Sequence, residues 1–125
     1  MYILDTSLYC AVFLEEDAHH VNALDMISGI DEKIYIPYFV FSETITVLTY
    51  RHSKELANEF IDFILSDERF VFINEDLLGE VSFWKGIEKR LSYIDIVLVY
   101  TAIKYGAELL SFDDEMNKLF LKLSQ

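Results

Sequence analysis

Four acidic residues of this 125-residue chain could do chemistry together: Asp5, Glu43, Asp95 and Asp113. Taken singly, each has an ordinary structural role, because Asp near a helix start caps backbone amides and Glu on a helix usually faces water. Their positions change that interpretation. Asp5 and Asp113 follow expected strands and Asp95 lies at an expected helix start, so these residues should meet in one crevice. Carboxylates gathered in this way repel one another unless a cation neutralises them.

An oxygen-only cluster of this kind favours a hard divalent cation. Mg²⁺ and Mn²⁺ prefer carboxylate and water oxygens, and Mg²⁺ takes an octahedral shell at ~2.1 Å. The cluster contains no histidine or cysteine, so zinc is the poorer choice. Cys10 is the only cysteine of the chain, which excludes an internal disulfide and a cysteine-rich zinc site. The residue types therefore predict a magnesium-type site.

Short apolar runs alternate along the chain with segments of helical periodicity. The expected strands are short and bounded by turn or helix-start residues, and they are Tyr2–Leu4, Lys33–Ile36, Arg69–Ile73 and Glu108–Phe112. The expected helices are Leu8–Leu14, Ala18–Ile30, Phe39–Tyr50, Lys54–Leu65, Glu75–Lys89, Ser92–Tyr105 and a terminal helix that Asp113 starts. The segment Phe39–Tyr50 is rich in threonine and β-branched residues, yet its apolar spacing favours a helix.

This order of elements predicts an α/β fold. Strands separated by helices need crossover connections, which give a parallel sheet covered on both faces. We expect a three-layer α/β/α arrangement with a central parallel sheet of four or five short strands. The fifth strand is either a brief edge within Phe120–Leu123 or missing. The chain has no linker or repeat, so residues 1–125 are interpreted as a single domain.

The bulk composition limits the possible partners. A net charge of −12 disfavours nucleic-acid binding unless metal ions reverse the local field, and it favours a basic protein partner. Hydrophobic residues make up 53% of the chain, which indicates either a rich core or apolar surface that a partner or a second copy covers. No apolar run is long enough to cross a membrane, and no signal peptide is visible. We therefore expect a cytoplasmic protein.

Several motifs together resemble the PIN-domain family, in particular the VapC-type toxin ribonucleases of toxin–antitoxin systems. That family begins with a hydrophobic strand ending in Asp, then has a Glu on a helix after a proline, an Asp after a Ser-aromatic turn, and a strand closing in Thr-x-Asp. The matching segments here are Ile3–Ser7, Pro37 with Phe41–Glu43, Leu91–Asp95 and Leu110–Asp113. Their order and spacing cover nearly the whole chain.

The resemblance implies roles for individual residues. Asp5, Asp95 and Asp113 would bind the metal, and Glu43 would complete an acidic quartet. Two further residues would have accessory roles: Ser111 replaces the usual Thr and would orient a carboxylate, and Glu115 would assist through water. Apart from the resemblance, Arg51 lies two turns beyond Glu43 on the expected helix and could reach phosphate, although a solvated cation at the helix end is its ordinary interpretation.

The same resemblance implies a function and partners. The function would be Mg²⁺- or Mn²⁺-dependent hydrolysis of RNA phosphodiester bonds by the toxin of a toxin–antitoxin module. The partners would be the RNA substrate, a small antitoxin with a basic segment, and a second copy in a homodimer.

Two alternatives compete with this reading. The first is a catalytically silent PIN-like module that binds a protein, which the apolar surplus favours. The second is a receiver domain, which needs an acidic pair after the first strand and a lysine after the last; the chain has neither.

His19 and His20 follow Glu15 and Glu16 by four residues, so we interpret all four as ordinary surface pairs. Most aromatic residues lie on core-facing stripes and are assigned to the core.

Overall fold

The computed structural model describes all 125 residues and contains one sheet of four parallel strands. The sheet order is β3-β2-β1-β4, with β1 Tyr2–Leu4, β2 Ile34–Pro37, β3 Phe70–Ile73 and β4 Glu108–Leu110. Seven helices connect and follow these strands: α1 Thr6–Phe13, α2 His20–Gly29, α3 Tyr38–Arg51, α4 Lys54–Ser66, α5 Leu77–Lys85, α6 Tyr93–Tyr105 and α7 Asp114–Leu123. No helix is both long enough and apolar enough to cross a membrane.

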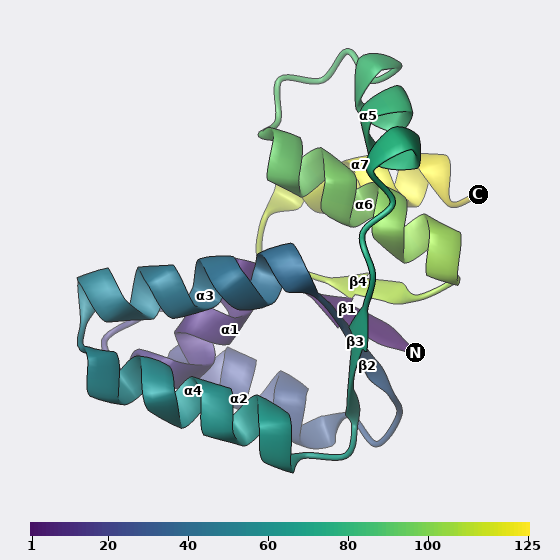
Figure 1. Cartoon of the computed structure of the whole chain (residues 1–125). Coiled ribbons are helices and arrows are strands. Elements are labelled where there is room, and N and C mark those ends of the chain that lie inside the picture. The colour runs from purple at the N-terminus through teal and green to yellow at the C-terminus, as the bar shows by residue number, and fades with distance from the viewer.

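The helices form two layers around the sheet. On one side α1 packs against α2 and α3, and α3 packs against α4, whereas on the other side α6 packs against α5 and α7 (Figure 1). The expected three-layer α/β/α architecture with a parallel sheet is therefore confirmed. The ambiguous segment around Phe39–Tyr50 is helical, as its apolar spacing predicted.

The first and last strands are neighbours in the sheet, with β1 inside it and β4 at one edge. In the register of this parallel pair Leu4 lies opposite Leu110, so the residues that follow, Asp5 and Ser111, leave the sheet side by side. The Asp5 amide also donates to the Leu110 carbonyl at 3.4 Å. The carboxyl ends of β1 and β4 thus bring together two polar residues more than a hundred positions apart.

The structure answers the open question of a fifth strand and shortens one expected helix. Residues 120–123 belong to α7, so the sheet has no fifth strand. The helix expected over Glu75–Lys89 spans only Leu77–Lys85. Its start is fixed by a reciprocal cap, in which Gly79 donates to the Asp76 carboxylate and the Asp76 amide donates to Glu80.

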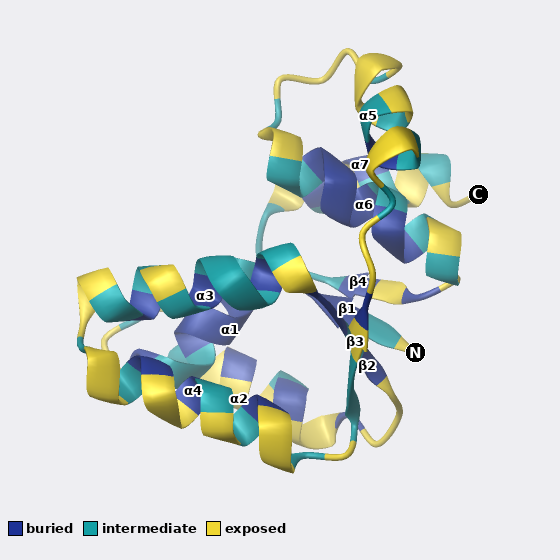
Figure 2. Cartoon of the chain, in the orientation of Figure 1, coloured by how far each residue is buried: buried dark blue, intermediate teal, exposed yellow.

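The core lies between the sheet and the inner faces of the helices (Figure 2). The side chains of Ile3, Leu4, Ile34 and Ile36 are fully buried, as expected for strands covered on both faces. The start of α6 is buried nearly all round over Ile96–Val99, which makes this helix part of the core as well as a wall of the crevice at the strand ends.

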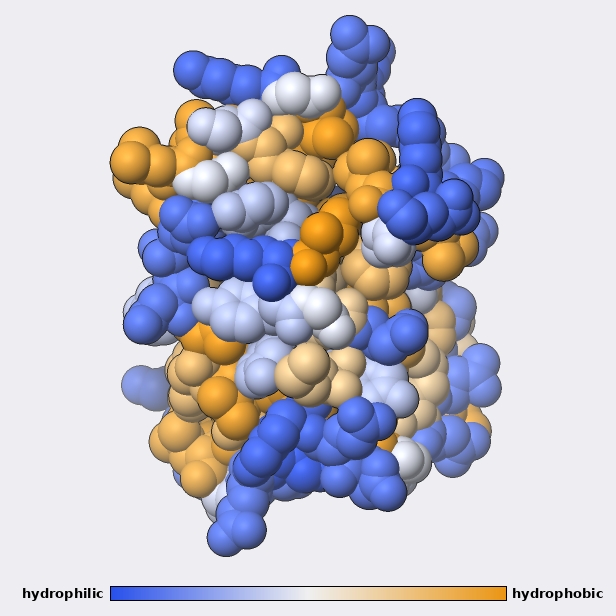
Figure 3. Space-filling model, turned by 90° about the vertical axis from the view of Figure 1, so that its right-hand side faces the viewer, coloured by the Kyte–Doolittle hydropathy of each residue, from blue (hydrophilic) through white to orange (hydrophobic).

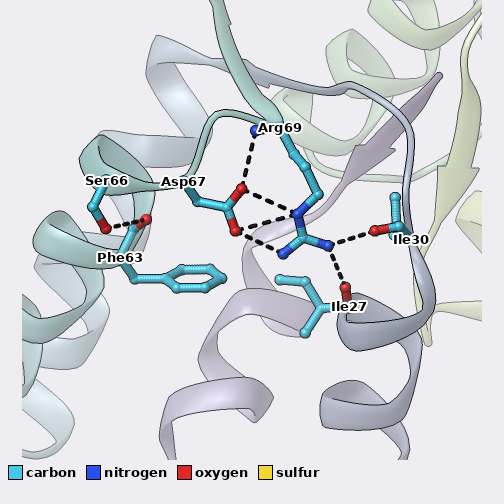
Figure 4. Close-up of polar contacts among 6 residues, drawn as sticks. All are labelled: Ile27, Ile30, Phe63, Ser66, Asp67 and Arg69. Carbon is cyan, nitrogen blue, oxygen red and sulfur yellow. Dashed lines mark hydrogen bonds and ion pairs between the residues drawn. The ribbon is translucent and has the colours of Figure 1, made fainter.

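Arg69, just before β3, ties the opposite edge of the sheet to α2 (Figure 4). Its guanidinium donates to the Ile27 and Ile30 carbonyls at 2.7 and 2.6 Å, which are free acceptors at the end of α2. It also pairs with the Asp67 carboxylate at 2.8 Å. Because this planar cation satisfies three groups at once, it fixes the α2–β2 connection against the start of β3.

The apolar surplus is divided between core and surface. Leu77 and Leu78 of α5 are 67% and 81% exposed, and Trp84 and Tyr93 nearby are also exposed. Figure 3 shows a face of the molecule on which hydrophobic groups lie among charged ones. The exposed apolar residues of α5 form the largest group of this kind on one element.

A polar cluster attaches α5 to α6. The Asp76 carboxylate accepts hydrogen bonds from the Tyr100 hydroxyl at 2.7 Å and from the Lys104 ammonium at 3.0 Å. These contacts, led by Tyr100, lower the pKa of Asp76 to about 2. Gly79 faces the cluster so closely that an added Cβ would clash with the Tyr100 hydroxyl and the Asp76 carboxylate. The attachment of α5 therefore depends on a residue without a side chain.

Gly79→Ala is expected to destabilise the protein by about 1–3 kcal/mol, because the new methyl group overpacks the Asp76–Tyr100 contact. Gly29→Ala is the matched control: its Cβ meets no atom within 4 Å, and the loss of backbone freedom in the unfolded chain should stabilise by about 0.5–1 kcal/mol. Urea denaturation of both variants measures the difference. Equal stabilities would show that α5 tolerates the methyl group.

Candidate active site

A cleft of about 360 Å³ opens at the carboxyl ends of the strands, and all four sequence-predicted acids line it. Asp5 comes from the end of β1, Glu43 from α3, Asp95 from the first turn of α6 and Asp113 from the start of α7. Apolar side chains complete the walls, namely Val40, Val47, Ile94, Leu98 and Met116. The structure thus gathers carboxylates from four separate elements around one hollow.

Asp5 is the most buried of these acids, with only 5% of its surface exposed. It caps α1, where its Oδ1 accepts from the Leu8 amide at 2.9 Å. Its Oδ2 accepts from the hydroxyls of Ser7 at 2.9 Å and Ser111 at 2.6 Å. Burial raises the pKa of Asp5, and the three hydrogen bonds oppose that rise. These donors use three of the four lone pairs of the carboxylate, so one lone pair of Oδ1 has no donor.

Ser111 links two of the acids. Its hydroxyl donates to Asp5 and also accepts from the Asp113 amide at 2.9 Å. Asp113 in turn caps α7 by accepting from the Met116 amide at 3.1 Å. The hydroxyl expected at this position is therefore present and orients the Asp5 carboxylate.

Asp95 and Glu43 occupy opposite walls of the cleft. Asp95 is half-buried in the first turn of α6, whose cap Ser92 accepts from the Asp95 amide at 3.1 Å. Burial raises the pKa of Asp95, and the negative charges of Asp113, Asp5 and Glu43 raise it further. The four carboxylates are therefore close enough to repel one another across the cleft, which favours a compensating cation.

The donor set fits a hard cation that keeps part of its water shell. No three carboxylate, imidazole or thiol groups converge closely enough to enclose an ion directly. Mg²⁺ commonly binds through one or two carboxylates and several waters, so such an enclosure is not required. Cys10 also lines the cleft, but burial raises the pKa of its thiol to about 11, so it stays neutral and is a poor ligand.

Two accessory residues of the sequence prediction lie in different places. Arg51, the last residue of α3, is exposed, lines the cleft and forms no ion pair. Glu115 does not line the cleft; it pairs with Lys89 at 3.2 Å and Lys118 at 3.7 Å. The pairing with Lys89 lowers the pKa of Glu115.

Three polar residues of the cleft were not singled out from the sequence. Ser7 donates to Asp5, and the Thr6 hydroxyl is buried without a hydrogen-bond partner. Asp17, in the turn after α1, adds a fifth carboxylate. Thr6 and Ser7 could have been found from their place beside Asp5, but Asp17 reaches the cleft through a turn that has no sequence signature.

The surface pairing expected for His19 and His20 is wrong. Residues 15–19 form turns and not a helix, so a spacing of four residues does not bring Glu15 or Glu16 beside the histidines. None of these residues forms an ion pair. Instead, His20 Nδ1 contacts the Ala11 carbonyl at 2.7 Å, and the His19 ring stacks on Phe112.

The chain belongs to the PIN-domain family, whose family model matches residues 2–120. This membership excludes the receiver-domain alternative. No curated protein matches the sequence significantly.

Two solved structures have the same fold. The Mycobacterium tuberculosis VapC20 structure, described as a Sarcin-Ricin loop cleaving toxin, has a TM-score of 0.83, 21% identity and 95% coverage of both chains. The second is VapBC2 from Rickettsia felis bound to a DNA fragment from their promoter. It has a TM-score of 0.70, 18% identity and coverage of 94% of this chain and 91% of the other.

Asp5→Asn is expected to raise the free energy of unfolding at pH 7 by roughly 1 kcal/mol, because it removes a buried charge. Since the folded-state pKa of Asp5 is raised, the folded protein binds this proton more tightly than the unfolded chain. The wild type therefore loses stability as the pH rises from the ordinary value of 3.8 through the raised value.

The difference in free energy of unfolding between wild type and Asp5→Asn should therefore disappear below pH 3.8. Urea denaturation in EDTA from pH 3 to 7 measures it, with the exposed acid variant Asp62→Asn as control. A less stable Asp5→Asn at pH 7 would show that the three hydrogen bonds to the carboxylate outweigh its burial.

Proposed function

We propose that this PIN-domain protein is a metal-dependent endoribonuclease and the toxin of a toxin–antitoxin pair. One observation carries the proposal: Asp5, Glu43, Asp95 and Asp113 line a single cleft at the carboxyl ends of the strands. The fold shared with VapC20, a Sarcin-Ricin loop cleaving toxin, supports the same reading.

The metal would be Mg²⁺ or Mn²⁺, held by Asp5, Asp95 and Asp113 with help from Glu43, in part through coordinated waters, because no three of these groups enclose an ion directly. Such an ion supplies two effects, because it lowers the pKa of a coordinated water and stabilises negative charge on a phosphate. Asp5 is prepared for this role, since Ser7, Ser111 and the Leu8 amide fix its orientation and leave one Oδ1 lone pair. Hydrogen-bonded partners of this kind tune metal ligands.

The remaining residues of the cleft would position substrate and water. Glu43 is the best placed to orient the attacking water and accept its proton, because it comes from α3 and not from the strand ends. Arg51 lies two turns further along the same helix and has no acidic partner. Its guanidinium would bind a phosphate of the RNA.

A protein partner is part of the proposal. An antitoxin with a basic segment fits the acidic cleft and the net charge of −12. The exposed apolar side chains of α5 would lie against the antitoxin or a second copy of the chain. The same surface also favours the second candidate, a catalytically silent binding module. Measurements of metal binding and of RNA cleavage are therefore needed to distinguish the nuclease from the silent module.

Asp5→Asn should abolish Mn²⁺-dependent cleavage of a fluorophore-quencher RNA while the protein stays folded. Loss of activity follows because the neutral amide lacks the negative charge with which the carboxylate holds a divalent cation. Asp62→Asn, purified in the same way, is the control, because Asp62 is an exposed acid on α4 outside the cleft.

Full activity of Asp5→Asn, or activity that persists in EDTA, would contradict the nuclease proposal. Calorimetric titration with Mn²⁺ provides the second measurement. Absence of both metal binding and cleavage in the wild type would favour the silent binding module.

Arg51→Ala is expected to raise KM for RNA by about tenfold with little change in kcat, because it removes one charged hydrogen bond to phosphate. The salt dependence of KM should weaken as well, since one fewer phosphate is neutralised. Lys54→Ala is the control, because Lys54 is a nearby exposed cation outside the cleft. If both variants raise KM equally, the change comes from the loss of any positive charge and not from a specific contact of Arg51 with phosphate.

A further inference from the structure

The His19 and Phe112 rings form a parallel stack, with centroids 4.2 Å apart and an interplanar angle of 8°. All other aromatic pairs in the protein are tilted or edge-on, with interplanar angles of 37° or more. Phe112 is half-buried and packs against the core, whereas His19 is exposed. Because Phe112 covers the inner face of the imidazole, the exposed surface of His19 is its outer face and edges.

The two stacked rings do not line the acidic cleft themselves, but the segments that carry them do. Phe112 stands between Ser111, which donates to Asp5, and Asp113, which lines the cleft. On the other side of the stack, His19 follows the cleft residue Asp17 by two positions. Both rings are therefore carried by segments that also contribute to the cleft.

Hydrogen bonds hold the backbone of both ring-bearing segments before any ligand binds. The His19 amide donates to Asp17 Oδ1 at 2.8 Å, and the His19 carbonyl accepts from Ala23 at 2.8 Å in the first turn of α2. The Phe112 segment is held by the Ser111–Asp113 contact and by Asn117, which donates to the Ser111 carbonyl at 2.9 Å. A ligand that uses this surface would lose little entropy by ordering it.

The charge of the site indicates which ligand the stack suits. Five carboxylates and one guanidinium line the cleft, so attraction of phosphate by the protein alone is weak. Stacking on a flat ring provides affinity that does not depend on cations. Single-stranded RNA is commonly bound in this way on aromatic side chains, histidine included.

We propose that the His19–Phe112 stack is the platform for a base of single-stranded RNA next to the cleaved phosphate. This inference rests on the proposed ribonuclease function and names a positioning surface for its substrate. The base would lie on the outer face of the imidazole, which Phe112 supports from behind. The platform then aligns the RNA backbone with the acidic cleft.

The test measures binding of a short single-stranded RNA that contains 2-aminopurine, in EDTA so that no cleavage occurs. Stacking quenches the fluorescence of this base. His19→Ala should lose the quenching and weaken binding by about tenfold, the typical effect of removing one stacked ring. His19→Phe should retain both. His52→Ala is the control, because His52 is exposed at the end of α3 and outside the cleft.

A second variant, Phe112→Leu, keeps the apolar contact with the core but removes the supporting ring, and it should also weaken binding and quenching. Circular dichroism and thermal melting establish that each variant is folded. With Mn²⁺ present, His19→Ala should raise KM for RNA and leave kcat close to the wild-type value.

The failures of the two proposals are distinguishable. Quenching that depends on His19 in a protein without cleavage would support the platform and overturn the nuclease. Cleavage with unchanged KM and quenching in His19→Ala would overturn the platform and leave the nuclease intact. If the wild type neither quenches nor binds the RNA, the platform is overturned as well.

Discussion

One constraint underlies the rest of the structure: the carboxylate of Asp5 has to be accommodated at the end of a buried strand. Burial works against the charged form, and the Leu8 amide with the hydroxyls of Ser7 and Ser111 offsets part of that cost. Two of these donors belong to the first turn of α1, and the third comes from just beyond β4. The β1–β4 register is therefore required by the acid as much as by the sheet, because a shift of β4 would remove Ser111 from Asp5.

Most of the fold follows from local patterns. Apolar runs and caps predict all four strands and all seven helices, and Gly106 ends α6 at a φ of 63°, as its type suggests. The differences concern where elements begin and end. The helix expected over Glu75–Lys89 begins after its cap Asp76 and ends before Gly86, and residues 120–123, left open as a fifth strand, continue α7, which buries Met116 and Leu119.

The site divides in the same way. Asp5, Asp95 and Asp113 could be located because strand ends and helix starts mark them, and Glu43 came from resemblance to a family. Asp17 and the His19–Phe112 stack could not be found, since a turn without regular spacing places Asp17 in the cleft and His19 on Phe112. The histidines were misread because the i to i+4 rule holds only on helices. Glu115 is the opposite case: the sequence suggested it for the site, but it forms ion pairs with two lysines outside the cleft.

The pairing of β1 with β4 also has a consequence for synthesis of the protein. A ribosome completes Asp5 early, but its partner Ser111 lies 106 residues later in the chain. Until β4 has emerged and docked, the carboxylate lacks its shortest hydrogen bond and the cleft lacks one wall. The acidic hollow is thus absent from nascent chains, so any activity that it supports arises only after the whole sheet has closed.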